Sequence, residues 1–163
     1  MLLYLKEEIM LKKNDIVDFI NRNEYDMRKT KNSRWIDQKC TPDVICIIAE
    51  AALEFTEKDN SLEFNKTDIW RSDFSIEQAR DCLKKSDSTK VTTKNEYNKL
   101  YSQPLLMLAS ANVLEDVNKT SNRHKYVVKN RDVLEFISMR TENALFFLQN
   151  YIEKVLVNSD MNN

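Results

Sequence analysis

Glycine is absent from all 163 residues of this chain, and its absence limits the local structures that the backbone can form. Glycine allows a backbone to approach a phosphate closely and to take positive φ angles at no steric cost. Phosphate-cradling loops and dinucleotide-binding fingerprints therefore cannot form, nor can a glycine-flanked nucleophile elbow. Asparagine tolerates the left-handed conformation, so we expect Asn112 to end a helix in the place of glycine.

Composition restricts the function classes further. Hydrophobic residues make up 42% and charged residues 31%, which fits one folded domain. The single histidine and three cysteines without a CxxC pair do not supply a Cys/His zinc site, and an odd cysteine count fits a reducing compartment. Apolar runs are too short for a signal peptide or a membrane span. We therefore expect a cytoplasmic protein with no cofactor of its own and no membrane contact.

Helix-start patterns recur along the chain. Thr41-Pro42-Asp43 predicts a helix that stops before Asp59. Capping boxes predict one helix over 75–83 and another over 93–111, in which Pro104 introduces a kink or a split. Asn130 can cap a final helix, which the sequence predicts to run without interruption to about residue 156.

Between the last two helices the pattern changes from helical to extended. Leu114–Val117 and Lys125–Val128 alternate or are β-branched, as in strands, and a polar, turn-rich loop joins them. Residues 118–131 hold five lysines or arginines and no acid. A basic hairpin after a helix is the layout of a winged helix-turn-helix.

The expected fold is therefore mostly α with a small β-hairpin. Residues 1–64 form an N-terminal helical part, 65–129 a winged helix-turn-helix, and 130–163 a long C-terminal helix, all packed as one compact domain.

This layout predicts double-stranded DNA as the partner. In a helix-turn-helix the second helix enters the major groove, where Asn and Gln bind adenine and Lys binds guanine or phosphate. The alternative for this helix is an ordinary solvated polar face. The candidate DNA-binding residues on the helix and hairpin are Lys94, Asn95, Asn98, Lys99, Ser102, Gln103, Lys119, Arg123 and Lys125.

The predicted C-terminal helix is apolar on two faces. Leu134, Leu145 and Leu148 belong to a core stripe, whereas Phe147 and Tyr151 lie on its flank together with Phe136. We expect these aromatic residues to stay partly exposed and to mediate a homodimer through 131–156, or a contact with a nuclease domain missing from this chain.

Catalytic patterns are weak. Asp37-Gln38-Lys39 has the acid-x-Lys spacing of metal-dependent nucleases, but Asp43 then follows at a helix start rather than on a neighbouring strand. We therefore expect no catalytic residues and no metal ligands in this chain.

Several segments nevertheless resemble the N-terminal region of a group of type II restriction endonucleases. They are Arg34–Val44, Thr67–Trp70, Asn130–Ile137, Asn143–Leu145 and Tyr151–Leu156. The resemblance implies a host-defence enzyme of a restriction-modification system that cuts DNA with Mg²⁺, this region binding DNA and the nuclease core following later in the chain. The expected function is DNA binding by a part of such an enzyme truncated before that core.

Two other functions fit the same residues. One is a stand-alone winged-helix transcriptional regulator, and the other is a helical protein–protein adaptor whose basic hairpin is merely solvated. Salt-dependent DNA affinity separates the adaptor from both DNA-binding proteins.

Overall fold

The computed structural model describes residues 13–23, 41–58, 63–71, 94–118 and 124–161. The predicted helix over 75–83 and the acid-x-Lys pattern at 37–39 lie outside these ranges, as does most of Arg34–Val44. The described elements are a helix over residues 13–22, α3 (Pro42–Lys58), α4 (Lys66–Arg71), α6 (Lys94–Ser110), β1 (Leu114–Asp116), β2 (Tyr126–Val128), α7 (Arg131–Met139) and α8 (Thr141–Met161). The mostly helical fold with a small antiparallel hairpin is thus confirmed.

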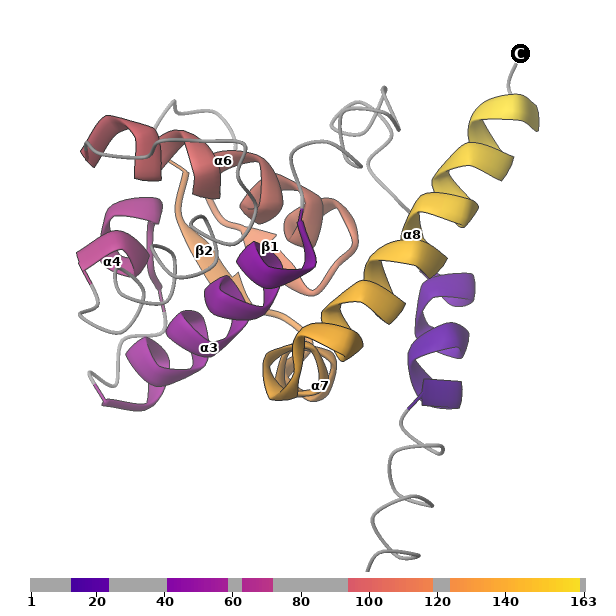
Figure 1. Cartoon of the computed structure of the whole chain (residues 1–163), viewed down its shortest axis with the longest axis horizontal. Coiled ribbons are helices and arrows are strands. Elements are labelled where there is room, and N and C mark those ends of the chain that lie inside the picture. Colours follow the sequence, from indigo (N-terminus) through magenta and orange to yellow (C-terminus); the bar gives the residue numbers. More distant parts are fainter. Residues whose placement is uncertain (1–12, 24–40, 59–62, 72–93, 119–123, 162–163) are drawn as a thin grey trace, which may run out of the picture.

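Helix α3 lies at the centre of the core and packs against α4, α6, α7 and α8 (Figure 1). It begins directly after Thr41, as the sequence predicts, and Asp43 occupies its first turn. Small and branched residues fill its buried faces. Ile45, Ile48, Ala51 and Ala52 have no solvent exposure, and this lets the neighbouring helices approach α3 from several sides.

The helix over residues 13–22 packs beside α8 in Figure 1. Its Ile16 and Ile20 are buried in the same core as α3, and the Lys154 Nζ atom donates to the Ile20 carbonyl at 3.1 Å. At the other end of this helix, Lys13 lies over the Phe146 ring, with Nζ 5.4 Å from the centroid. Both contacts join the N-terminal helix to α8.

The two strands pair antiparallel, with Leu114 opposite Val128 and Asp116 opposite Tyr126. A third segment pairs with strand β2. Phe64, just before α4, forms an antiparallel bridge with Tyr126, and the backbone N–O distances are 2.9 and 2.7 Å. Strand β2 is therefore hydrogen-bonded on both edges, to β1 and to Phe64.

Helix α6 continues through Pro104, which excludes the split, one of the two alternatives predicted there. Its end confirms the prediction for Asn112, whose φ angle is 63°. The Val113 N–H donates to the Leu108 carbonyl at 3.0 Å, and the Asn112 N–H donates to Ala109 at 3.1 Å. These two bonds form a Schellman motif. Asparagine takes the left-handed position in this chain without glycine, and β1 follows directly.

The prediction of one uninterrupted C-terminal helix is wrong. Asn130 caps α7 as expected, since its side chain accepts from the Val133 N–H at 3.1 Å. Helix α7 then ends at Met139, and the backbone of Arg140, which follows it, is extended with φ −156° and ψ 148°. The buried Asn143 side chain donates to the Phe136 carbonyl at 2.9 Å across this corner. That bond satisfies a carbonyl which the end of the helix would otherwise leave unpaired.

The corner also changes which apolar residues are buried. Phe136, Phe147 and Tyr151 are each at most 2% exposed, so the prediction that they stay partly exposed is wrong. Leu145, which the sequence assigned to the core stripe, is 40% exposed instead. A homodimer through residues 131–156 therefore loses the physical argument that the aromatic residues gave it.

Within the described ranges, no helix combines the length and the apolarity needed to cross a bilayer.

Candidate nucleic-acid interface

The two halves of α6 have different surroundings. Among its side chains from Tyr101 to Ser110, none is classed as exposed, and Tyr101, Leu105 and Leu108 are fully buried. The Ser110 hydroxyl also lies 2.5 Å from the Tyr151 hydroxyl, which ties α6 to α8 inside the core. The C-terminal half of α6 is therefore anchored in the core.

Four of the predicted DNA-binding residues lie in that N-terminal half. The backbone from Lys94 to Lys99 is helical, which puts these residues on α6 as predicted. The side chains of Lys94, Asn95, Asn98 and Lys99 lie outside the described structure, so their contact with DNA stays a prediction.

Ser102 and Gln103 are partly buried. The Lys66 Nζ atom donates to the Ser102 hydroxyl at 2.9 Å and so joins α4 to α6. The Gln103 Oε1 atom is buried and has no hydrogen-bond partner in the described part of the chain. This amide oxygen is therefore not accessible from the solvent.

The basic residues of the hairpin region differ in their solvent exposure and in their ion pairs. Lys125 and Lys129 are exposed, whereas Lys119 and Arg123 lie outside the described residues. Arg131 forms ion pairs with Glu57 and with Glu135. Two carboxylates thus offset its charge, and Arg131 adds little positive potential to the hairpin surface.

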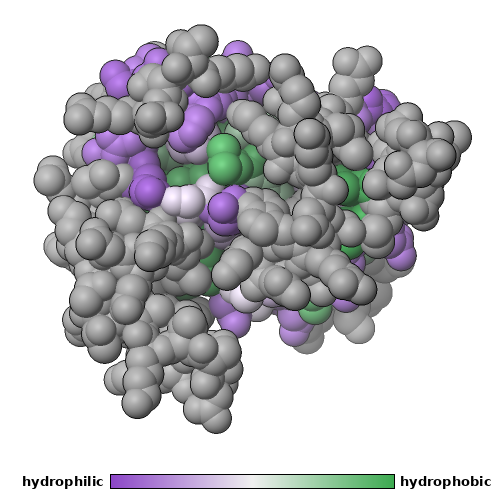
Figure 2. Space-filling model, turned by 90° about the horizontal axis from the view of Figure 1, so that it is seen from above, coloured by the Kyte–Doolittle hydropathy of each residue, from purple (hydrophilic) through white to green (hydrophobic). Residues whose placement is uncertain are grey.

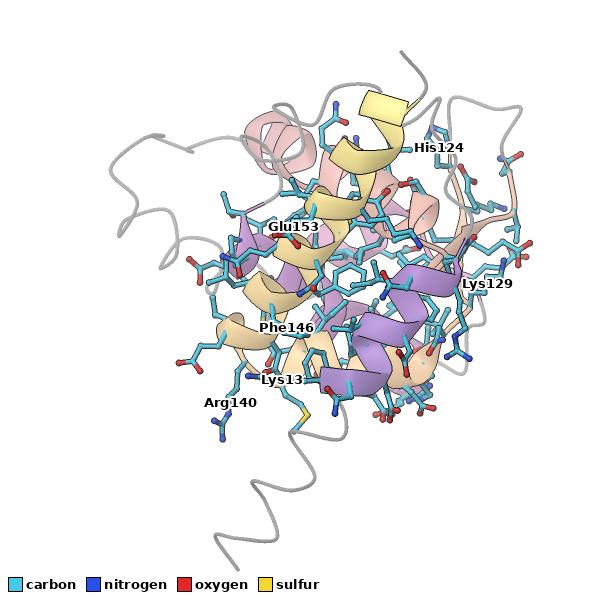
Figure 3. All side chains as sticks on the ribbon, turned by 90° about the vertical axis from the view of Figure 1, so that its right-hand side faces the viewer. Lys13, His124, Lys129, Arg140, Phe146 and Glu153 are labelled. Carbon is cyan, nitrogen blue, oxygen red and sulfur yellow. The ribbon has the colours of Figure 1, made fainter. Side chains whose placement is uncertain are left out.

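Figure 3 shows His124 and Lys129 on the same side of the molecule, with Arg140 and Lys13 on the other side. On the face seen in Figure 2, hydrophilic residues border a smaller group of apolar ones.

A polar cluster braces the base of the hairpin. The Asp116 side chain is fully buried, and its Oδ2 atom lies 2.5 Å from the His124 Nδ1 atom. The other carboxylate oxygen accepts from the Asn118 N–H at 3.0 Å. The His124 ring stacks on the Tyr126 ring, with the two centroids 6.2 Å apart. The centroids of the Tyr126 and Phe64 rings are 6.0 Å apart. The cluster joins the two ends of the hairpin loop to the bridge at Phe64.

Electrostatics keeps the Tyr126 phenol neutral. Burial, and then the negative charge of Asp116, raises the pKa of Tyr126 well above its ordinary value. Both effects disfavour a phenolate. The ionisable partners inside this cluster are therefore Asp116 and His124.

Sequence reasoning missed Asp116 and His124. The available indication was the alternation of β1, in which Leu114 and Asp116 face inward and Glu115 faces solvent. A carboxylate on the buried face of a strand requires a partner, and His124 is the residue that the antiparallel register brings near it.

The described residues contain no group of three or more His, Cys, Asp or Glu side chains that could hold a metal ion. No family model, curated protein or solved structure matches this chain.

Proposed function

We propose that this chain binds double-stranded DNA through a winged helix-turn-helix formed by α3, α4, α6 and the β1–β2 hairpin. The observation that carries the proposal is the bridge between Phe64 and Tyr126. Along the chain, α3 is followed by the short extended segment at Phe64, then by α4 and α6, and then by the β1–β2 hairpin. The extended segment at Phe64 pairs with β2, the last strand. That order and pairing are typical of winged-helix modules.

The distribution of charge and burial supports the same function. The C-terminal half of α6 is buried in the core, and the polar N-terminal half continues the same helix. An α-helix fits the major groove of B-DNA, which is about 12 Å wide. Lys125 and Lys129 are exposed on the hairpin side and can neutralise phosphates.

The kind of protein to which this DNA-binding module belongs is inferred from the sequence resemblance alone. We propose that the module serves a type II restriction endonuclease, in which a separate nuclease core would use Mg²⁺ to cut the bound DNA. The DNA-binding proposal does not depend on this setting, because it rests on the helices and the hairpin.

A salt titration tests the proposal. Fluorescence anisotropy with a labelled random-sequence duplex should show that log K falls linearly with log salt concentration. Lys125→Gln should reduce the steepness of that slope by about 0.9, the value of one phosphate contact on duplex DNA. Arg140→Gln is the matched control, because Arg140 is also exposed but lies at the α7–α8 corner. Its slope should equal that of the unmutated chain.

An unmutated chain without salt-dependent affinity for DNA would overturn the proposal and favour the adaptor. Equal slope changes in both variants would mean that the hairpin is not a specific contact surface.

A further inference from the structure

The orientation of His124 is defined by its contacts at the base of the hairpin. The Nδ1 atom faces the Asp116 carboxylate, which has no solvent exposure, whereas the His124 side chain is 36% exposed. The two ring nitrogens of histidine point in different directions. With Nδ1 turned to the buried carboxylate, the Nε2 atom is directed away from it.

The proton count of the imidazole then decides what Nε2 can bind. A neutral imidazole has one N–H, and Asp116 accepts it at Nδ1, so Nε2 is left as an acceptor. A protonated imidazole has N–H groups at both nitrogens. Only the protonated ring can donate from Nε2 to a phosphate oxygen while Nδ1 keeps its bond to Asp116.

We propose that His124, oriented by Asp116, is a phosphate-binding residue of the hairpin and makes DNA affinity depend on pH. This inference rests on the proposed DNA-binding function and adds a ligand and a form of regulation to it. Histidine is the side chain that ordinarily changes charge between about pH 5 and pH 8. Protonation adds one positive charge to the ring, next to the exposed Lys125.

The neighbouring groups do not supply this pH dependence themselves. In the described part of the chain, two titratable groups face the His124 ring, the Asp116 carboxylate from β1 and the stacked Tyr126 phenol from β2. The phenol stays neutral, because burial and the Asp116 charge raise its pKa. A further charged side chain, Lys125, is next to His124 in the sequence. The backbone N–H of Asn118, which also binds Asp116, does not titrate.

The test compares salt titrations at about pH 5.5 and about pH 8, with the labelled random-sequence duplex and the full chain. The slope of log K against log salt should be steeper at the lower pH by up to about 0.9, because one more phosphate contact releases counterions. In His124→Gln the slopes at the two pH values should be equal and should match that of the unmutated chain at the higher pH. Lys125→Gln is the matched control, since it should lower both slopes equally and keep their difference.

Asp116→Asn tests the orienting role. It should reduce the pH-dependent difference, because the amide cannot hold an imidazolium as the carboxylate does. Circular dichroism checks that this variant is folded. If it unfolds, His124→Gln decides alone, because the His124 side chain is partly exposed and its replacement should leave the fold intact.

The outcomes separate the two proposals. DNA binding with the same slope at both pH values in the unmutated chain would overturn the role of His124 and leave the proposed function standing. A pH-dependent slope that persists in His124→Gln would also overturn it. Absence of salt-dependent binding at both pH values would overturn the DNA-binding function, and the role of His124 with it.

Discussion

The β1–β2 hairpin and the α7–α8 corner follow each other in the chain but are stabilised by different interactions. At the base of the hairpin a buried carboxylate binds a partly exposed histidine, and lysines are exposed next to it. At the corner, the buried Asn143 amide donates to the Phe136 carbonyl. In α8, which follows, Phe147 and Tyr151 stack with parallel rings in the core. The difference indicates that substitutions at the corner should mainly change stability, whereas substitutions on the hairpin should mainly change binding.

The largest expected effect is at Phe147, which is fully buried in α8. Phe147→Ala should lower the free energy of unfolding by about 3–5 kcal/mol, the usual cost of a cavity of this size. Urea denaturation monitored by circular dichroism measures it. Leu145→Ala is the matched control on the same helix, because Leu145 is 40% exposed, and it should cost about 1 kcal/mol or less. Similar losses for the two variants would contradict the burial of Phe147.

A smaller loss is expected at the corner itself. Asn143→Ala removes the side-chain bond to the Phe136 carbonyl and leaves that buried group unpaired, which should cost about 1–3 kcal/mol. Asn150→Ala is the matched control. Its side chain also donates to a backbone carbonyl, that of Phe146 at 2.8 Å, but within α8 and only partly buried. A larger loss for Asn150→Ala in the same urea assay would show that Asn143 does not close the corner.

The hairpin could be predicted from the sequence because its determinants are local. Alternating apolar residues and a polar loop define the strands, and an asparagine after an apolar helical run defines the helix end. The start of α3 was equally local, since Thr41, Pro42 and Asp43 lie together.

The corner could not be predicted in the same way, because neither glycine nor proline occurs near it. A continuous helix would place residues 134, 137, 141, 144 and 148 on one stripe, and Thr141 is the polar member of this set. That single residue was the available indication of a break. The Asp116–His124 contact was missed for a related reason, since it depends on the pairing register and not on residues adjacent in sequence.

Asn112 ends α6 with a positive φ angle, and its replacement should change the free energy of unfolding. Asn112→Ala should lower the free energy of unfolding by about 1 kcal/mol, because a β-carbon without a compensating polar group disfavours the positive φ angle. Asn112→Gly should be neutral or slightly stabilising, since glycine takes this conformation freely. Thermal denaturation of both variants measures the difference. If Ala and Gly were equally destabilising, the cost would come from the lost asparagine side chain and not from the backbone conformation.

The smallest expected effect is at Arg131, where the two regions meet. Its ion pairs with Glu57 and Glu135 are exposed, and such pairs contribute between zero and about 1 kcal/mol. Arg131→Gln should therefore change the free energy of unfolding by less than about 1 kcal/mol. It should also leave the salt slope of DNA binding nearly unchanged, because two carboxylates already offset the charge of Arg131. Lys125→Gln, which removes an exposed hairpin charge, should flatten that slope. If Arg131→Gln flattened the slope as much as Lys125→Gln does, Arg131 would leave its carboxylates to bind DNA, and the binding surface would extend from the hairpin onto α7.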